Sequence, residues 1–418
     1  MTSRWFWLLR RLSRRIWVRA ALFSLGGVVT ALAATWLSPY IPYDLPTKIG
    51  SDAVDNILGI IASSMLTVTT FSLSTMVSAY SAATSNVTPR ATRLVIEDKT
   101  THNVLSTFIG SFLFSLVGII ALSTGLYGDR GRVILFAVTL LVIVAIVVTL
   151  LRWIDHLSSL GRVTQTTERV EAAALAAMRE RRRAPFMGGA PLHDPASIPR
   201  SARPVFANEV GYVQHVDVGA LAGIAADGSG RIYLRSIPGD LVDPTAPIAM
   251  ADGLDVENQE QRIRNCFSVG DIRSYDQDPR FGASVLTEIA SRALSPGIND
   301  PGTAIDVIGR AVRLLAVWGE PPEREGEIEH PSVFVPPVMI GDLFDDLFTP
   351  IARDGASTVE IGVRLQKAFR TLARYGRDGF AENARRHSRE ALERAEAALA
   401  IEADKQRLRT LANEVGAT

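Results

Sequence analysis

Hydroxyl side chains are concentrated in one long uncharged segment of the chain. Between residues 63 and 85, twelve of 23 residues are Ser or Thr, and no charged residue occurs from Asn56 to Pro89. Several of these positions follow one another at alternating steps of three and four residues, which places them on one stripe of a helix. The stripe residues are Ser64, Thr67, Phe71, Ser74, Ser78 and Ser81.

This stripe has two interpretations, and the sequence leaves both open. Small Ser, Thr, Ala and Gly residues let membrane helices approach closely, and Ser and Thr can hydrogen-bond to carbonyls of their own helix. Alternatively, the hydroxyls line a pathway for an ion or small solute, with Phe71 as an apolar constriction. The interiors of the apolar segments carry no ionisable residue, which argues against a proton-coupled pump.

A second group of polar residues lies in the dense segment 276–300. The group consists of Asp276, Asp278, Arg292, Asn299 and Asp300. These side chains either converge on a polar ligand site or have structural roles. In the structural alternative, Asp278 and Asp300 are helix N-caps and Arg292 pairs with a carboxylate.

The motif inventory argues against an enzyme. The aqueous part of the chain contains no GxxxxGK[ST], GxSxG, HExxH or GxGxxG pattern. Cys266 is the only cysteine, and the six histidines have no metal-ligand spacing, so no metal site is expected. No lysine occurs between residues 100 and 366, which excludes a biotinyl or lipoyl carrier there. We expect no cofactor and no nucleic-acid partner.

The elements that carry the stripe are membrane spans. A span needs about 20 apolar residues to cross the hydrocarbon core. Four segments qualify: Ala20 to about Leu37, a run that starts near Val54, about Val104–Tyr127, and Val133–Leu151. The first also resembles a signal peptide, but it is long and has no small-x-small cleavage site before the prolines that follow, so we interpret it as a retained anchor.

Positive charges in the loops predict the orientation of these spans. Residues 1–20 contain six arginines and no acid, whereas the loop 38–55 contains one lysine and three aspartates. Arg90, Arg93 and Lys99 lie in the next loop, and an arginine-rich segment follows the fourth span. Both termini are therefore predicted to be cytoplasmic. The Arg181–Arg183 cluster is expected to solvate a helix end or to touch anionic lipid headgroups.

The fold class predicted from these patterns is an α-helical membrane domain with four transmembrane helices, followed by a cytoplasmic α+β domain. The boundaries are a four-span domain at 1–155, a cytoplasmic helix and linker at 156–204, a small α/β or β-barrel-like module at 205–265 and a mainly helical domain at 266–418. Within the module we expect strands at Gly211–Val216 and Arg231–Ile237, a helical turn between them, and a hairpin across 238–249.

Two helices joined by a tight loop are predicted in the segment 278–315. Pro296 and Gly297 interrupt the first helix, and Asp300 with Pro301 begins the second. From Gly341 the tail is expected to be helical, ending in one long helix at about 379–415.

Several stretches resemble one family. The runs QDPRFG at 277–282 and RALSPGINDPGTA at 292–304 are similar to the signature of a bacterial family of membrane proteins, domain of unknown function 2254. The segments 71–93 and 211–217 resemble further parts of that family, so the likeness covers about residues 10–410. The resemblance implies a bacterial inner-membrane location and the span arrangement above, and it supplies no activity.

Two functional hypotheses lead after these exclusions, and an enzyme that uses the Asp, Arg and Asn side chains of the segment 276–300 is a weaker third. The first is a homo-oligomeric channel or passive transporter for a small ion or solute, with the Ser/Thr stripe lining the path and the cytoplasmic part regulating it. The alternative is a membrane-anchored sensor or scaffold whose cytoplasmic domain binds a partner or small ligand. In both cases the lipid bilayer surrounds the spans.

Overall fold

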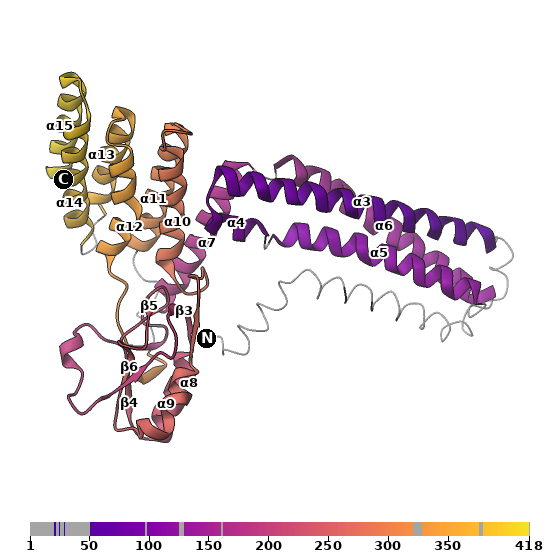
Figure 1. Ribbon diagram of the computed structural model, residues 1–418, viewed down its shortest axis with the longest axis horizontal. Coiled ribbons are helices and arrows are strands. Elements are labelled where there is room, and N and C mark those ends of the chain that lie inside the picture. Colours follow the sequence, from indigo (N-terminus) through magenta and orange to yellow (C-terminus); the bar gives the residue numbers. More distant parts are fainter. Residues whose placement is uncertain are drawn as a thin grey trace. The chain divides into compact units, whose positions relative to one another are not determined.

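The structure is a computed structural model of the 418-residue chain (Figure 1). It describes residues 51–96, 98–124, 129–159, 162–320, 328–375 and 379–417, together with three single positions before residue 51. The chain divides into two compact units between Gln165 and Thr166. The first unit is helical and the second combines helices with sheets, which agrees with the fold class in its coarse form.

Apolar helices build the first unit. Its described helices are α3 (Ser51–Asn86), α4 (Pro89–Ile96), α5 (Lys99–Ser123) and α6 (Asp129–Ser159). Three of them contain segments long and apolar enough to cross a membrane, namely Ala53–Ser81, Thr100–Ser123 and Val133–Leu157. These segments have 29, 24 and 25 residues, and each exceeds the length of about 20 that a span requires. The predicted first span, Ala20 to about Leu37, lies outside the described residues.

Helix α5 is the most buried of the three apolar helices and packs against both others. Leu58 and Val54 of α3 meet Phe114 of α5 and Leu135 of α6 in one apolar cluster. A second cluster joins the three helices around Phe108 and Trp153, both nearly inaccessible to solvent. The unit is therefore held together by large apolar side chains on the inward faces of its helices.

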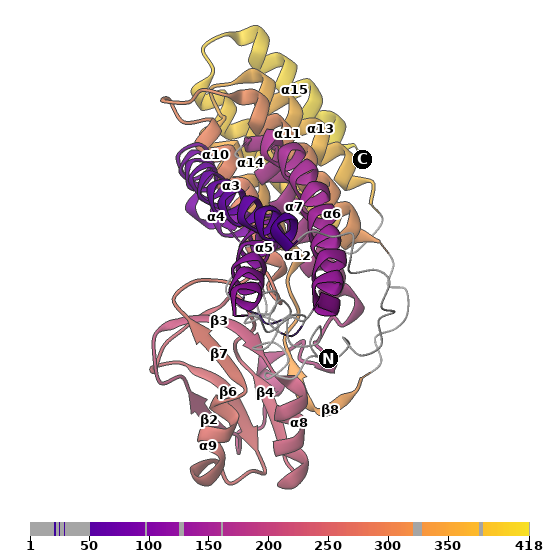
Figure 2. The ribbon, with the colours of Figure 1, turned by 90° about the vertical axis from the view of Figure 1, so that its right-hand side faces the viewer.

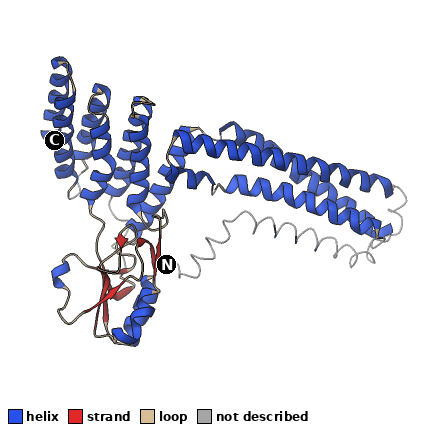
Figure 3. Cartoon of the chain, in the orientation of Figure 1, coloured by secondary structure: helices blue, strands red, loops and turns tan. Residues whose placement is uncertain are grey.

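The second unit contains α7 (Val163–Arg183) from Thr166 onward, a sheet region and a helical region (Figure 3). The strands are β1 (Gly189–Pro191), β2 (Arg203–Phe206), β3 (Gly211–Val216), β4 (Arg231–Leu234), β5 (Leu241–Val242), β6 (Pro247–Asp252), β7 (Phe267–Gly270) and β8 (His330–Val335). Two helices, α8 (Val218–Asp227) and α9 (Val256–Arg264), and a short 3-10 turn at Pro195–Ser197 lie between the first seven of these strands in the chain.

The strands form two sheets. The larger has the order β1-β8-β4-β6-β2, with β8 parallel to both of its neighbours and the other pairs antiparallel. The smaller is antiparallel, with β3 between β5 and β7. Inward-facing residues of both sheets, including Val213, Ile232 and Val333, share one core with Leu221 of α8. Helix α8 packs against β4 and β8, as Figure 2 shows.

The helical region consists of three successive antiparallel helix pairs. The helices are α10 (Pro279–Ala293), α11 (Pro301–Gly319), α12 (Ile340–Asp354), α13 (Val359–Ala373), α14 (Phe380–Ala398) and α15 (Glu402–Gly416). The predicted apolar face of α10, which includes Phe281, Val285 and Ile289, is buried. The two predicted helices and their tight connecting loop are therefore confirmed.

The structure confirms the strands predicted near 211 and 231 and the helix between them, and it corrects four other predictions. The stretch 184–204 is more than a linker, because it forms β1 and begins β2. Segment 238–249 is not a hairpin, because β5 pairs with β3 whereas β6 pairs with β2 and β4. The sheet module does not end at residue 265, since β7 and β8 belong to it. The predicted final helix is two helices, α14 and α15.

Candidate functional site

The hydroxyl stripe lies on the exposed side of α3. Ser64, Thr67, Ser74, Ser78 and Ser81 are all exposed in the described structure. Phe71, in the middle of the stripe, is 64% exposed. The positions that pack against α5 instead include Leu58 and Met65, and Met76 on the same side of α3 is also buried.

The exposed surface of α3 has two chemically different sectors. At about 100° per residue, Leu66, Leu73 and Val77 form an exposed apolar sector beside the hydroxyl stripe. Apolar side chains suit contact with lipid tails, whereas a row of hydroxyls gains nothing from lipid. The division therefore indicates that the hydroxyl sector meets protein or water and the apolar sector meets lipid.

The close approach of α3 and α5 depends on small residues of α5, not on the α3 stripe. Ser111 and Ser115 of α5 are buried, and a Cβ atom on Gly118 would lie 2.9 Å from the Leu58 Cδ1 atom. The packing interpretation of the stripe thus has no counterpart among the described helices, because its residues are exposed there.

Several hydroxyls of α3 donate to carbonyls of their own helix. Thr67 donates to the Ser63 carbonyl at 3.0 Å, and Thr70 donates to the Leu66 carbonyl at 2.9 Å. A hydroxyl oxygen that has donated its proton keeps lone pairs that accept hydrogen bonds or contact a cation. The arrangement suits hydrated cations or neutral polar solutes.

The second predicted group does not form one site. Asp276 and Asp278 lie at the beginning of α10, whereas Arg292, Asn299 and Asp300 lie at or beyond its end. Fifteen helical residues separate the two ends, a distance of about 22 Å. The five side chains therefore cannot converge on one small ligand within this unit.

Asp278 and Asp300 are both helix N-caps. Asp278 accepts hydrogen bonds from the Arg280 and Phe281 amides at 3.0 and 3.1 Å. Asp300 accepts from the amide of Thr303 at 3.1 Å and from its hydroxyl at 2.6 Å. These bonds hold the pKa of the Asp300 carboxyl below its ordinary value. Their main role is to satisfy amides that the helix leaves without partners.

The remaining members of the group have local roles in the described structure. Asp276 accepts from the Ser274 hydroxyl at 3.2 Å. The Arg292 carbonyl accepts from the Ser295 hydroxyl at 2.6 Å in the turn after α10. Asn299 takes a left-handed backbone with φ of 51°, a conformation that asparagine tolerates better than most residues.

A buried polar cluster near the start of α10 was missed by the sequence analysis except for Asp278. Arg273 holds both oxygens of Asp278, at 2.7 and 3.0 Å. Asp240 accepts from the Ile237 amide at 2.8 Å, and burial raises the pKa of its carboxyl. The backbone of residue 239 can lie this close to the Asp278 carboxylate only because the residue is glycine. A Cβ atom on Gly239 would lie 2.5 Å from the Asp278 Oδ2 atom.

Arg181 is the least expected member of this region. The prediction that the 181–183 cluster is solvated is wrong for Arg181, which is only 4% exposed. Its Nη2 donates to the Gln277 carbonyl at 3.1 Å. Burial lowers the pKa of Arg181 to about 10, although the charges of Asp278 and Asp240 oppose the change. Position 181 continues the buried stripe of α7 through 170, 174 and 178, and this spacing was the available signal.

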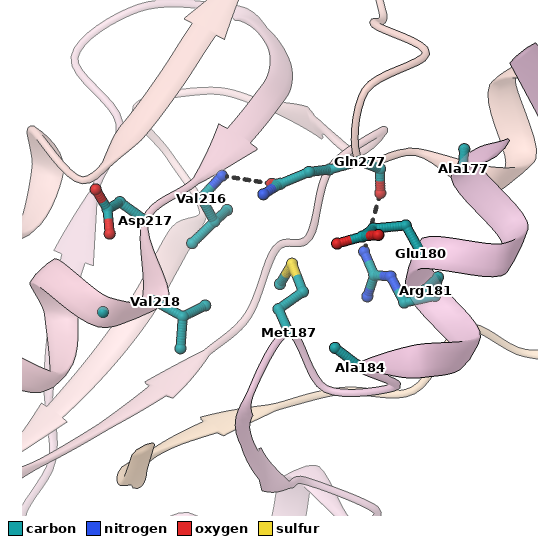
Figure 4. A pocket seen from close by; sticks show the side chains of 10 residues that line it. Ala177, Glu180, Arg181, Ala184, Met187, Val216, Asp217, Val218 and Gln277 are labelled. Atoms are coloured by element: carbon teal, nitrogen blue, oxygen red, sulfur yellow. Dashed lines mark hydrogen bonds between the residues drawn. The ribbon is translucent and has the colours of Figure 1, made fainter. Parts of the chain in front are cut away.

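Arg181 and Gln277 line a cavity of about 70 Å³ within the second unit (Figure 4). Gln277 spans one side, because its side-chain oxygen accepts from the Val216 amide at 3.0 Å. Met187 and the first residues of α8 line other parts of the wall. Among the described residues, no three His, Cys, Asp or Glu side chains gather in a way that suits a metal ion.

Three long apolar helices followed by an α+β unit fit an integral membrane protein. The comparison with known families agrees. The chain belongs to the family described as "Predicted membrane protein (DUF2254)", whose model matches residues 13–371. The match ends within α13, so α14 and α15 lie beyond it.

Curated relatives occur in mycobacteria. The chain is 28% identical over 261 residues to the uncharacterized protein Rv1290c of Mycobacterium tuberculosis and, equally, to the uncharacterized protein Mb1321c of Mycobacterium bovis. The matched region is 60% of this chain and 50% of each relative, so the chain spans about half of their length. No solved structure matches the chain.

Proposed function

We propose that the protein is a homo-oligomeric channel or passive transporter of the bacterial inner membrane. In this proposal the α3 hydroxyl stripe lines a path for a small ion or polar solute, and the second unit is cytoplasmic and regulates the path. The observation that carries the proposal is the position of the stripe, which lies on the exposed side of α3 next to an apolar sector. No enzymatic step is assigned to the chain.

Symmetry explains why one subunit is insufficient. Large side chains fill the space between α3, α5 and α6, so these helices leave no aqueous path between them. Copies of α3 arranged around a symmetry axis would bring their hydroxyl sectors together and leave the apolar sectors toward lipid. Phe71 would then form the narrowest apolar ring of the path, and its exposure leaves it available for that role.

Cysteine accessibility tests this arrangement. Single cysteines at Thr67, Ser74 or Ser81, in a Cys266→Ser background, are expected to react with small charged thiol reagents in membranes. Leu73→Cys is the matched control, because Leu73 is 48% exposed in the apolar sector and lipid would shield it. Met76→Cys controls for burial, because the Met76 side chain is buried in the described structure. Equal protection of stripe and controls, with a monomeric mass in detergent, would overturn the proposal.

Conductance in planar bilayers gives a second readout. Phe71→Ala should widen the apolar constriction and raise the unitary conductance, whereas Ser74→Leu should lower it by making the path apolar. Leu73→Ala should leave the conductance unchanged because it lies in the neighbouring sector. A purified protein with no conductance under any condition would argue against a channel, and solute uptake into vesicles would then separate a transporter from no transport.

One observation favours a second candidate, a membrane-anchored sensor. The aqueous unit has its own apolar core and contains the cavity beside Arg181. A unit of this kind can bind a ligand whether or not the membrane helices conduct. This candidate predicts ligand binding without transport activity.

A further inference from the structure

The guanidinium of Arg181 has unused hydrogen-bonding capacity in a buried place. Its Nη2 donates to the Gln277 carbonyl, but its Nη1 is buried and has no hydrogen-bond partner among the described residues. The nearby carboxylate of Asp278 does not pair with Arg181 directly, because it forms its ion pair with Arg273. A buried charge without a direct counter-ion is costly, and an anionic ligand would remove that cost.

A second feature of the same cavity also suits an anion. Val218 and Gly219, the first two residues of α8, line it. The Asp217 side chain accepts from the Ala220 amide, and the Asp217 carbonyl accepts from the Leu221 amide. The cavity therefore adjoins the first turn of a ten-residue helix, where the positive end of the helix dipole favours an anion.

The rest of the wall is mainly apolar. Ala177, Ala184, Met187 and Val216 contribute side chains, and Figure 4 shows the Arg181 guanidinium extending from α7 toward the middle of this group. An inorganic anion would leave the apolar wall unused. A carboxylate attached to a short aliphatic body would satisfy both the guanidinium and the wall.

The acidic residues at the cavity limit the charge of the ligand. Glu180 is exposed at the rim, and the carboxylate of Asp217 is bonded to the Ala220 amide. Both would repel a polyanion. We propose that the cavity bounded by Arg181, Gln277 and the start of α8 binds a small organic monocarboxylate. This inference goes beyond the proposed pathway and supplies a ligand class for the sensor alternative.

The test uses the purified full-length protein in detergent, with thermal unfolding as the readout. Butyrate and hexanoate are the probes, and butyramide and inorganic phosphate are the comparison compounds. Ligand that exceeds its Kd about twenty-fold should raise the unfolding midpoint by about 3 °C or more. Butyramide and phosphate should give no comparable rise, because the first lacks the charge and the second lacks the aliphatic body.

Three variants localise the effect. Arg181→Gln should weaken carboxylate binding about ten-fold or more, since it removes the charged donor. Arg179→Gln is the matched control on the same helix, because Arg179 is exposed, and it should bind as the wild type does. Ala184→Leu should fill the cavity and abolish hexanoate binding while Arg181 stays in place. If Arg181→Gln fails to fold, the Ala184→Leu variant still tests the proposal.

The possible outcomes separate clearly. The proposal is overturned if neither carboxylate raises the midpoint, or if Ala184→Leu and Arg181→Gln bind as tightly as the wild type. A larger shift with phosphate than with hexanoate would overturn the ligand class. None of these measurements depends on conductance, so failure of the carboxylate site and failure of the membrane pathway are distinguishable.

Discussion

Arg310 donates to Glu171 at 2.5 Å, although 139 residues separate them in the chain. The Arg310 side chain is 6% exposed and the Glu171 side chain is 10% exposed, so this ion pair fixes α7 against α11 in a largely dry environment. Arg313 adds a two-pronged contact to the same carboxylate, with bonds of 2.6 and 3.0 Å.

Removal of the shared carboxylate should therefore destabilise the second unit strongly. Glu171→Gln leaves the buried Arg310 guanidinium with the Asp306 carboxylate as its remaining charged partner, and we expect a loss of about 3 kcal/mol in the free energy of unfolding. Arg313→Gln is the comparison variant, because the Arg313 side chain is 56% exposed, and it should cost about 1 kcal/mol or less. Denaturant unfolding in detergent measures both. Equal small losses would show that the pair contributes little.

The contribution of the Glu171 carboxylate to stability should depend on pH. Burial raises the pKa of Glu171, but the hydrogen bonds and charges of Arg313 and Arg310 outweigh it and bring the pKa below its ordinary value of 4.5. A carboxyl with a lowered folded pKa stabilises the protein above its unfolded pKa, and this contribution disappears as the pH falls through the folded pKa. The difference in unfolding midpoint between wild type and Glu171→Gln should thus be constant above about pH 5 and shrink below pH 4.5. A difference that grows on acidification would contradict this account.

A pair of glycine substitutions tests the close approach of α7 and α10. A Cβ atom on Gly282 would lie 2.4 Å from the Ala174 Cβ atom, so Gly282→Ala should destabilise by about 1–3 kcal/mol through overpacking. Gly223 lies on the exposed side of α8 with no heavy atom within 4 Å of its Cβ position. Gly223→Ala should stabilise by up to about 1 kcal/mol, because alanine is the better helix former. Thermal unfolding of the two variants should shift in opposite directions.

The two capping aspartates should respond differently to the same change. Asparagine caps a helix about as well as aspartate, so Asp300→Asn should alter the free energy of unfolding by about 0.5 kcal/mol or less, whereas Asp300→Ala should cost about 1 kcal/mol. Asp278→Asn removes the charge that faces Arg273 and should cost about 2 kcal/mol or more. Similar effects of Asn at both positions would mean that capping alone explains Asp278.

Local signals in the sequence were enough for elements whose partners are close in the chain. Asp300 followed by Pro301 marks a helix start by chemistry that needs no tertiary partner, and α11 begins there. Strand β8 gave no such signal. It pairs in parallel with β4, which lies about a hundred residues earlier in the chain. Turn residues at 238–247 indicate reversal of the chain but not the sheet that each strand joins.

The candidate site shows the same limit. The hydroxyl stripe of α3 was predictable because one helix carries it, and helical spacing alone places its members on one side. Arg181, Gln277 and the start of α8 come from three separated segments, so no spacing rule relates them. Arginine clusters usually indicate solvated helix ends, and only packing reveals that one member of this cluster is buried.

Orientation in the membrane provides a test of the topology on which the regulated-channel proposal rests. The charge distribution predicts that residues 38–55 are periplasmic, whereas the segment with Arg90, Arg93 and Lys99 and the entire second unit are cytoplasmic. Alkaline phosphatase is active only after export, so a fusion after Thr47 should be active in a bacterial host, and fusions after Lys99 or Arg183 should be inactive. Fusions of a reporter that requires the cytoplasm, at the same three positions, should give the opposite pattern and control for expression. An active phosphatase at Arg183 would place the Arg181 cavity outside the cytoplasm, and regulation of the path by a cytoplasmic ligand would then be ruled out.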